Sequence, residues 1–189
     1  MKNEVHMKEF DAQLWRDRVV GRKNRAIDNC YPVKGVETEY QRNLLAIADI
    51  EATNKWARAR NVKIFFTRMT SGIYHIGLKM VSISSTMAPV SQSIVLLHEL
   101  GHYLVGHDED HDRFGQGYPQ QNIPSSHHNF RHRLACVEEE MEAWARGWKL
   151  AKRLQLKCTR TEYDEIRVKC LKSYMKWGIN PGPRLSADE

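Results

Sequence analysis

The sequence predicts a small α+β domain built from a helix, a short three-stranded sheet and two further helices, with helical extensions at both ends. Three observations predict this order. Apolar residues recur every three or four positions over 36–60, as in an amphipathic helix. Apolar and polar residues then alternate in short runs within 62–84, as in strands. An apolar run at 91–105 and an acidic run at 137–148 both return to helical spacing.

The chain divides into three parts. Residues 1–35 form an N-terminal extension, with a weak helical pattern at 7–20 followed by a loop rich in turn-forming residues. Residues 36–155 form the main domain, interrupted by a long polar loop at 106–131. Loops of this length are usually functional or disordered, so this one is expected either to cover a cleft or to be a hydrophilic insertion. Residues 156–189 form a basic helical extension that ends in a flexible tail.

The three strands are expected at 62–67, 72–76 and 78–84, because each run is rich in apolar and β-branched residues. The last of them alternates apolar with polar residues and directly precedes the apolar helix. We therefore expect 78–84 to be an edge strand, where an extended peptide could add to the sheet.

The helix at 91–105 contains the motif HExxH. His98 and His102 are four residues apart, so they share one helix face and can hold one metal ion together. Glu99 lies beside that face, where its carboxylate can deprotonate a water molecule. Gly101 within the helix costs about 1 kcal/mol relative to alanine, which predicts a close packing neighbour. The alternative is a polar seam in which both histidines hydrogen-bond to neighbouring groups.

A catalytic zinc site usually has three protein ligands, so a third ligand is required. Three sources are open. A downstream ligand in the pattern HExxHxxGxxH would fall on Asp108, although the glycine, Gly106, comes one residue late. The polar segment that follows offers four histidines: His111, His127, His128 and His132. The third source is a carboxylate of the acidic helix.

The acidic helix at 137–148 carries four glutamates on little more than one turn. Small residues on both sides of Trp144 would let this helix approach the HExxH helix closely. We therefore favour Glu142, next to Ala143, as the third ligand. Glu139 and then Glu138 are the alternatives.

HELGH at 98–102, followed by an acidic helix bearing Glu-x-Glu-Ala, resembles the gluzincin metallopeptidases of the ImmA/IrrE type, which occur in phages, mobile elements and bacterial stress regulators. The resemblance covers roughly 62–154 and implies a small zincin-like domain. It implies Zn²⁺ held by His98, His102 and Glu142, with Glu99 as general base. The segment between the two helices is longer than usual in this family.

These residues predict a zinc metallopeptidase that cleaves a protein or peptide substrate, such as a regulator. Zinc lowers the pKa of bound water toward about 7, and Glu99 would take the proton. A second oxyanion donor is expected, with Tyr103, Tyr118 and His132 as candidates.

The main alternative is a metal-bound sensor or binding module that recognises a regulator or nucleic acid without cleavage. A phage protein acting on a host factor is compatible with either function. A DNA-associated protease of the SprT-like kind would instead have a histidine as its third ligand.

The composition of the chain bears on nucleic-acid binding and on the cellular compartment. The net charge of +6 and pI of about 9.2 are mild for a nucleic-acid binder. Basic residues between 146 and 176 alternate with aromatic ones, a pattern that fits stacking on single-stranded bases but also the packed face of amphipathic helices. The chain shows no run of eighteen apolar residues, no secretory signal and no CxxC pair among its four cysteines, so we expect a cytoplasmic protein without a membrane span.

Overall fold

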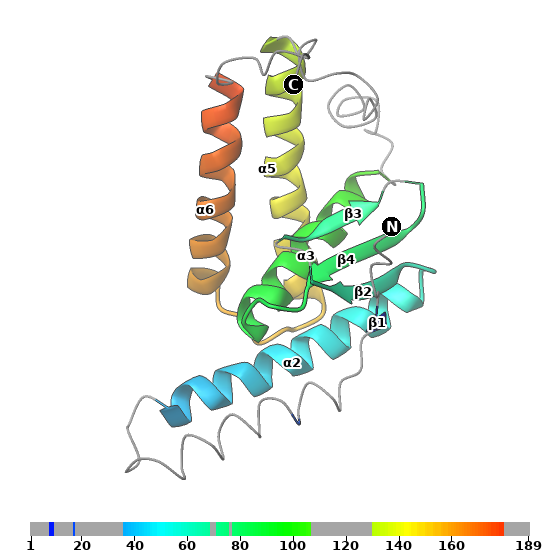
Figure 1. Ribbon diagram of the computed structural model, residues 1–189, viewed down its shortest axis with the longest axis vertical. Helices are drawn as coiled ribbons and strands as arrows, with labels where there is room; N and C mark the ends of the chain where they lie inside the picture. The colour runs from blue at the N-terminus through cyan, green and yellow to red at the C-terminus, as the bar shows by residue number, and fades with distance from the viewer. Residues whose placement is uncertain are drawn as a thin grey trace, which may run out of the picture.

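The computed structural model describes residues 8–9, 17, 36–68, 71–75, 77–106 and 130–179. Within them the protein is α+β, as predicted, with a small mixed sheet and four long helices (Figure 1). The helices are α2 (Val36–Arg58), α3 (Pro89–Val105), α5 (Phe130–Arg153) and α6 (Arg160–Ile179). Most of the predicted polar loop at 106–131 lies outside the described residues.

The sheet contains the three expected strands, β2 (Lys63–Thr67), β3 (Ile73–His75) and β4 (Met80–Ser84). A short strand, β1 (Lys8–Glu9), adds to the outer side of β2, giving the order β1-β2-β4-β3. The strands β2 and β4 are parallel, and the other two pairs are antiparallel. Residues 8 and 9 are thus extended rather than helical, whereas Asp17 in the same predicted stretch is helical.

The prediction that 78–84 forms an edge strand is wrong. The strand β4 lies between β2 and β3, and β3 forms the edge. The alternation of apolar and polar residues suggested a strand with one solvent-exposed face, but Ser82 and Ser84 are buried. Their hydroxyls bond to His75 Nε2 at 2.9 Å and to Thr86 Oγ1 at 2.8 Å, so small serines occupy the core without an unmet hydrogen bond.

Helix α3 lies at the centre of the fold, in contact with the sheet, α2 and α5 (Figure 1). Thirteen of its 17 residues are buried, because neighbouring elements cover it nearly all round. The predicted close neighbour of Gly101 is present, since a Cβ at this position would overlap the carbonyl oxygen of Ala143 in α5. The helices α3 and α5 therefore pack backbone against backbone at the motif.

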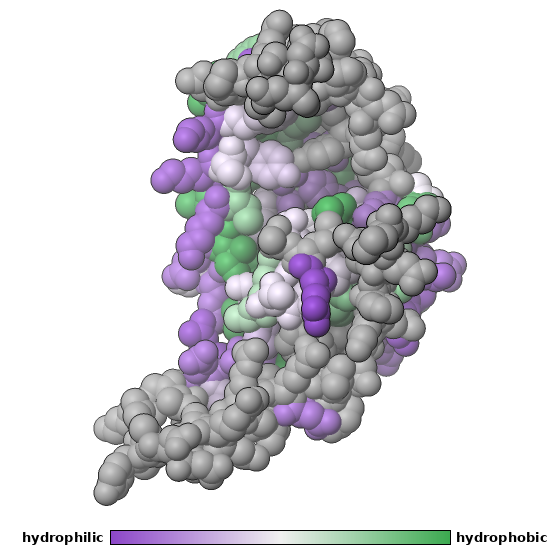
Figure 2. Space-filling view, viewed as in Figure 1, coloured by the Kyte–Doolittle hydropathy of each residue, from purple (hydrophilic) through white to green (hydrophobic). Residues whose placement is uncertain are grey.

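Helix α6 returns along α5 and contributes Tyr163 and Leu171 to the same core. Its start is fixed by Asp49 of α2, whose buried carboxylate accepts hydrogen bonds from the backbone N–H groups of Lys157 and Cys158 at 2.8–3.0 Å. Figure 2 shows hydrophilic side chains gathered along the outer side of α6. Among the described helices, none combines the length and apolarity needed to cross a bilayer.

Candidate metal centre

Helix α3 presents His98 and His102 on one face, one turn apart, as the motif predicts. Their ring centroids are 4.7 Å apart, and His98 is buried. Because α3 is buried on nearly every side, these imidazoles are withdrawn from water and need polar partners from another element.

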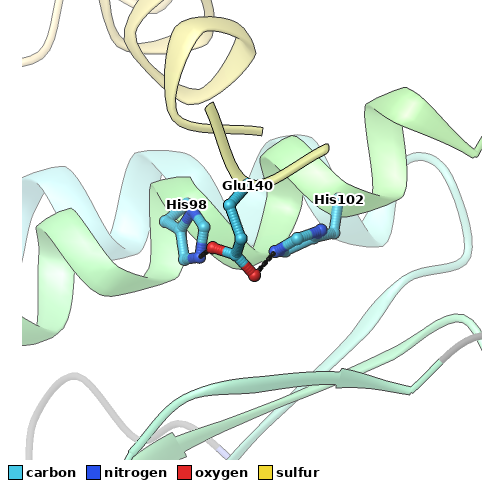
Figure 3. Close-up of side chains that lie close together, drawn as sticks. All are labelled: His98, His102 and Glu140. Atoms are coloured by element: carbon cyan, nitrogen blue, oxygen red, sulfur yellow. Dashed lines mark ion pairs between the residues drawn. The ribbon is translucent and has the colours of Figure 1, made fainter. Parts of the chain in front are cut away.

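That partner is Glu140 of α5, which reaches between the two rings (Figure 3). Its Oε2 lies 3.2 Å from Nε2 of His98, and its Oε1 lies 3.4 Å from Nε2 of His102. One ligand atom from each residue falls within 4.8 Å of the others, so the three form a group that could hold a metal ion. Glu140 is 1% exposed, a degree of burial that a carboxylate tolerates only with such partners.

The structure does not bring the predicted ligand Glu142 to the histidines. Its Oε1 instead accepts a hydrogen bond from Nε of Arg146 at 2.8 Å, on a partly exposed side of α5. Residues two positions apart in a helix point about 200° away from each other around its axis. Glu140 and Glu142 therefore cannot face the same neighbour. The third member of the group is therefore corrected from Glu142 to Glu140.

The two alternative glutamates are separated in the same way. Glu138 is exposed. Glu139 is buried, and its Oε1 lies 3.5 Å from Nδ1 of His102, the ring nitrogen that does not face Glu140. A carboxylate behind a histidine fixes the orientation and tautomer of the imidazole and makes it a better ligand. Glu139 thus supports His102 from behind.

Electrostatics in the group favour a bound cation. Burial lowers the pKa of His102, but hydrogen bonds to Glu139 and Glu140 outweigh burial and raise it well above the ordinary value. Burial raises the pKa of Glu140, but the two histidines outweigh burial and hold it far below its usual range. Positive charge placed among these donors is therefore stabilised, whether a proton or a metal ion carries it.

Glu99 lies apart from this group, on the side of α3 that faces the edge strand β3. A Cβ at Gly72 would lie 2.8 Å from Oε1 of Glu99, and the backbone N–H of Tyr74 donates a hydrogen bond to its carboxylate. Burial raises the pKa of Glu99, and the charges of His98 and His102 act in the opposite direction. The site therefore contains a second, nearby carboxylate with affinity for a proton. The contributions of Gly72 and Tyr74 were not visible in the sequence, because they depend on strand order.

The remaining candidates are placed as follows. Tyr103 is buried and packs edge-on against Trp56 and Tyr74, with centroids 6.3 Å and 6.0 Å away. Nε2 of His132 lies 3.6 Å from Sγ of Cys136. Cys136 is one helical turn before Glu140, and His132 is one turn before Cys136. The other named candidates lie outside the described residues: Asp108, His111, Tyr118, His127 and His128.

Comparison of the chain with family models, with curated proteins and with solved structures finds no match.

Proposed function

We propose that this protein is a zinc-dependent metallopeptidase that hydrolyses a peptide bond in a protein partner. One observation carries the proposal. Two histidines of an HExxH helix converge on a buried carboxylate from a second helix, while the glutamate of the motif stays outside that group and close to it. In this arrangement His98, His102 and Glu140 would act as metal ligands, and Glu99 would act as the general base.

The donor set fits zinc. Two imidazole nitrogens and one carboxylate oxygen are among the ligand sets of catalytic zinc, which keeps a fourth position for water or substrate. His98, His102 and Glu140 would hold the ion. Bound there, Zn²⁺ would act as a Lewis acid and make a water molecule more acidic.

Glu99 has the properties of the general base. It is buried and beside the imidazoles, so its raised pKa increases its affinity for a proton taken from water. The same group can return that proton to the leaving amine. Gly72 and Tyr74 border the carboxylate, so a substrate bound along β3 would lie close to Glu99.

The edge position of β3 gives a way to bind an extended peptide. Only one side of β3 pairs with another described strand, namely β4. A peptide that adds to the side of β3 with no described partner strand would lie along residues 73–75, next to Glu99. Strand addition recognises main chain, so selectivity would come from side-chain contacts near Ile73, which is partly exposed.

The test compares wild type, Glu99→Gln and Glu165→Gln, a matched change at an exposed position on α6. Each protein is incubated with a peptide library from a digested cell lysate, and new termini are identified by mass spectrometry. We expect Glu99→Gln to keep stoichiometric zinc and to lose cleavage by at least about 100-fold. Equal cleavage by all three proteins would contradict the role of Glu99.

A second candidate function is a zinc-bound sensor or binding module that does not cleave. A groove of about 280 Å³ beside α5 supports this candidate, because three basic residues, Arg146, Lys149 and Arg153, outnumber the single acidic residue, Glu142, in its lining and favour an acidic partner. Nucleic acid is less well supported, since Tyr163 is buried and cannot stack on a base. Zinc-loaded wild type that cleaves no library peptide would favour this candidate.

A further inference from the structure

The two histidines of the centre are supported from behind in different ways. Nδ1 of His102 faces the carboxylate of Glu139. Nδ1 of His98 is buried and has no hydrogen-bond partner among the groups described. When Nε2 of a neutral histidine binds a metal, Nδ1 carries the proton, and a carboxylate, carbonyl or water usually accepts it. Among the protein groups that the structure describes, no such acceptor meets Nδ1 of His98.

An aromatic stack takes its place. The imidazole of His98 lies on the indole of Trp144, with centroids 4.1 Å apart and an angle of 13° between the planes. A nearly parallel stack limits rotation of the imidazole about its χ2 bond, because turning the ring would drive its edge into the indole. The stack leaves Nε2 directed at Glu140, 3.2 Å away (Figure 3).

Trp144 is itself held firmly. It is fully buried, and the ring of Tyr163 packs edge-on against it at 5.4 Å. The hydroxyl of Tyr163 donates a 2.7 Å hydrogen bond to the carbonyl oxygen of Trp144. The helices α5 and α3 also approach closely at Gly147 of α5, where a Cβ would lie 2.5 Å from the carbonyl oxygen of Leu97 in α3. The indole is thus a fixed wall between α3 and α6.

We infer that Trp144 is a positioning residue of the metal centre, which orients His98 by stacking in place of a hydrogen bond to Nδ1. The inference rests on the proposed function, because it requires that His98 bind a metal. The printed contact of the indole with the metal-binding group is the stack on His98, so its expected effect is on the orientation of that ring. A planar ring at position 144 should suffice, and an aliphatic side chain should not.

The experiment measures the affinity for Co²⁺ and, by competition, for Zn²⁺ in wild type, Trp144→Phe, Trp144→Leu and Trp148→Leu. Trp148 is the matched control, one turn further along α5, where it packs on Tyr163 at 5.2 Å. We expect Trp144→Leu to bind each metal about 10-fold or more weakly, the lower end of the effect of losing a group that orients a ligand. Trp144→Phe and Trp148→Leu should stay within about threefold of wild type.

A second readout uses the folded wild type and does not depend on the leucine variant. Saturating Co²⁺ should quench the fluorescence of Trp144, which stacks on a ligand, so wild type should lose a larger share of its emission than Trp144→Phe. Circular dichroism establishes that each variant is folded.

The outcomes separate the two proposals. Wild type that binds neither metal contradicts the proposed function itself. Metal-binding wild type together with a folded Trp144→Leu of unchanged affinity overturns only the role of Trp144. Equal losses in the phenylalanine and leucine variants, or equal quenching in wild type and Trp144→Phe, would overturn it too. If Trp144→Leu does not fold, the comparison of quenching in wild type and Trp144→Phe decides.

Discussion

Replacing Gly101 by alanine should destabilise the protein, although the same change at an ordinary helix position stabilises it. Alanine has a helix propensity about 1 kcal/mol better than that of glycine. At Gly101, however, the new methyl group would overlap the carbonyl oxygen of Ala143, a main-chain atom that cannot rotate away. Overpacking of this kind costs about 1–3 kcal/mol, and a backbone obstacle belongs at the upper end. Gly101→Ala should therefore lower the free energy of unfolding by about 2 kcal/mol.

Gly106 provides the control. It ends α3 with φ −69° and ψ −10°, and a Cβ there would meet its nearest neighbours at 3.6 Å and 3.7 Å. Alanine fits without strain, so Gly106→Ala should leave stability unchanged or raise it by about 0.4–1 kcal/mol.

The assay is urea unfolding of both variants and wild type with a chelator present, so that metal binding does not add to the stability. For a small protein with a slope of about 1–3 kcal/mol per molar urea, 2 kcal/mol lowers the midpoint by roughly 1 M. A Gly101→Ala protein as stable as Gly106→Ala would refute the backbone contact between α3 and α5.

Three further changes test other parts of the structure. Gly72→Ala should displace the carboxylate of Glu99 and reduce peptide cleavage by at least about 10-fold, while zinc content stays at the wild-type level; unchanged cleavage would show that β3 does not border the base. Asp49→Ala should lower the free energy of unfolding by about 2–4 kcal/mol, because two backbone N–H groups before α6 lose their acceptor, and Asp49→Asn should cost less; equal stability of the alanine variant and wild type would contradict the buried cap. Burial raises the pKa of Glu162, but the N–H of Thr159 and the guanidinium of Arg42 outweigh it and lower the pKa below 4.5. The stabilisation from the ionised carboxylate is complete above that pH and is lost as the pH falls through the lowered pKa. Glu162→Gln should therefore lose less stability than wild type as the solution is acidified. Parallel plots of stability against pH for the two proteins would contradict the contacts of Glu162 with Arg42 and Thr159.

Local patterns predicted most of the fold correctly. The order of helix, strands and two helices follows from periodicities that short stretches carry by themselves. The sheet order was harder to predict, since it depends on long-range pairing. Lys8 and Glu9 pair with Phe66 and Phe65 across more than fifty residues, and no local signal announces such a contact.

The metal centre shows the same division. His98, Glu99 and His102 could be named because a single helix fixes their relation. Glu140 was missed because its selection depends on which face of α5 meets α3. A usable signal was present, since Ala143 and Gly147 are small residues four apart on one face, and Glu140 shares that face three residues before Ala143. Reading along this face would have placed Glu140, rather than Glu142, opposite the motif.

The most direct test is the metal content of purified wild type, Glu140→Ala and Glu142→Ala, measured by mass spectrometry after dialysis against buffer containing trace zinc. Wild type and Glu142→Ala should each carry close to one zinc per chain, and Glu140→Ala should carry little. Loss of zinc from Glu142→Ala with retention in Glu140→Ala, or a wild-type protein without bound transition metal, would contradict the assignment of this centre.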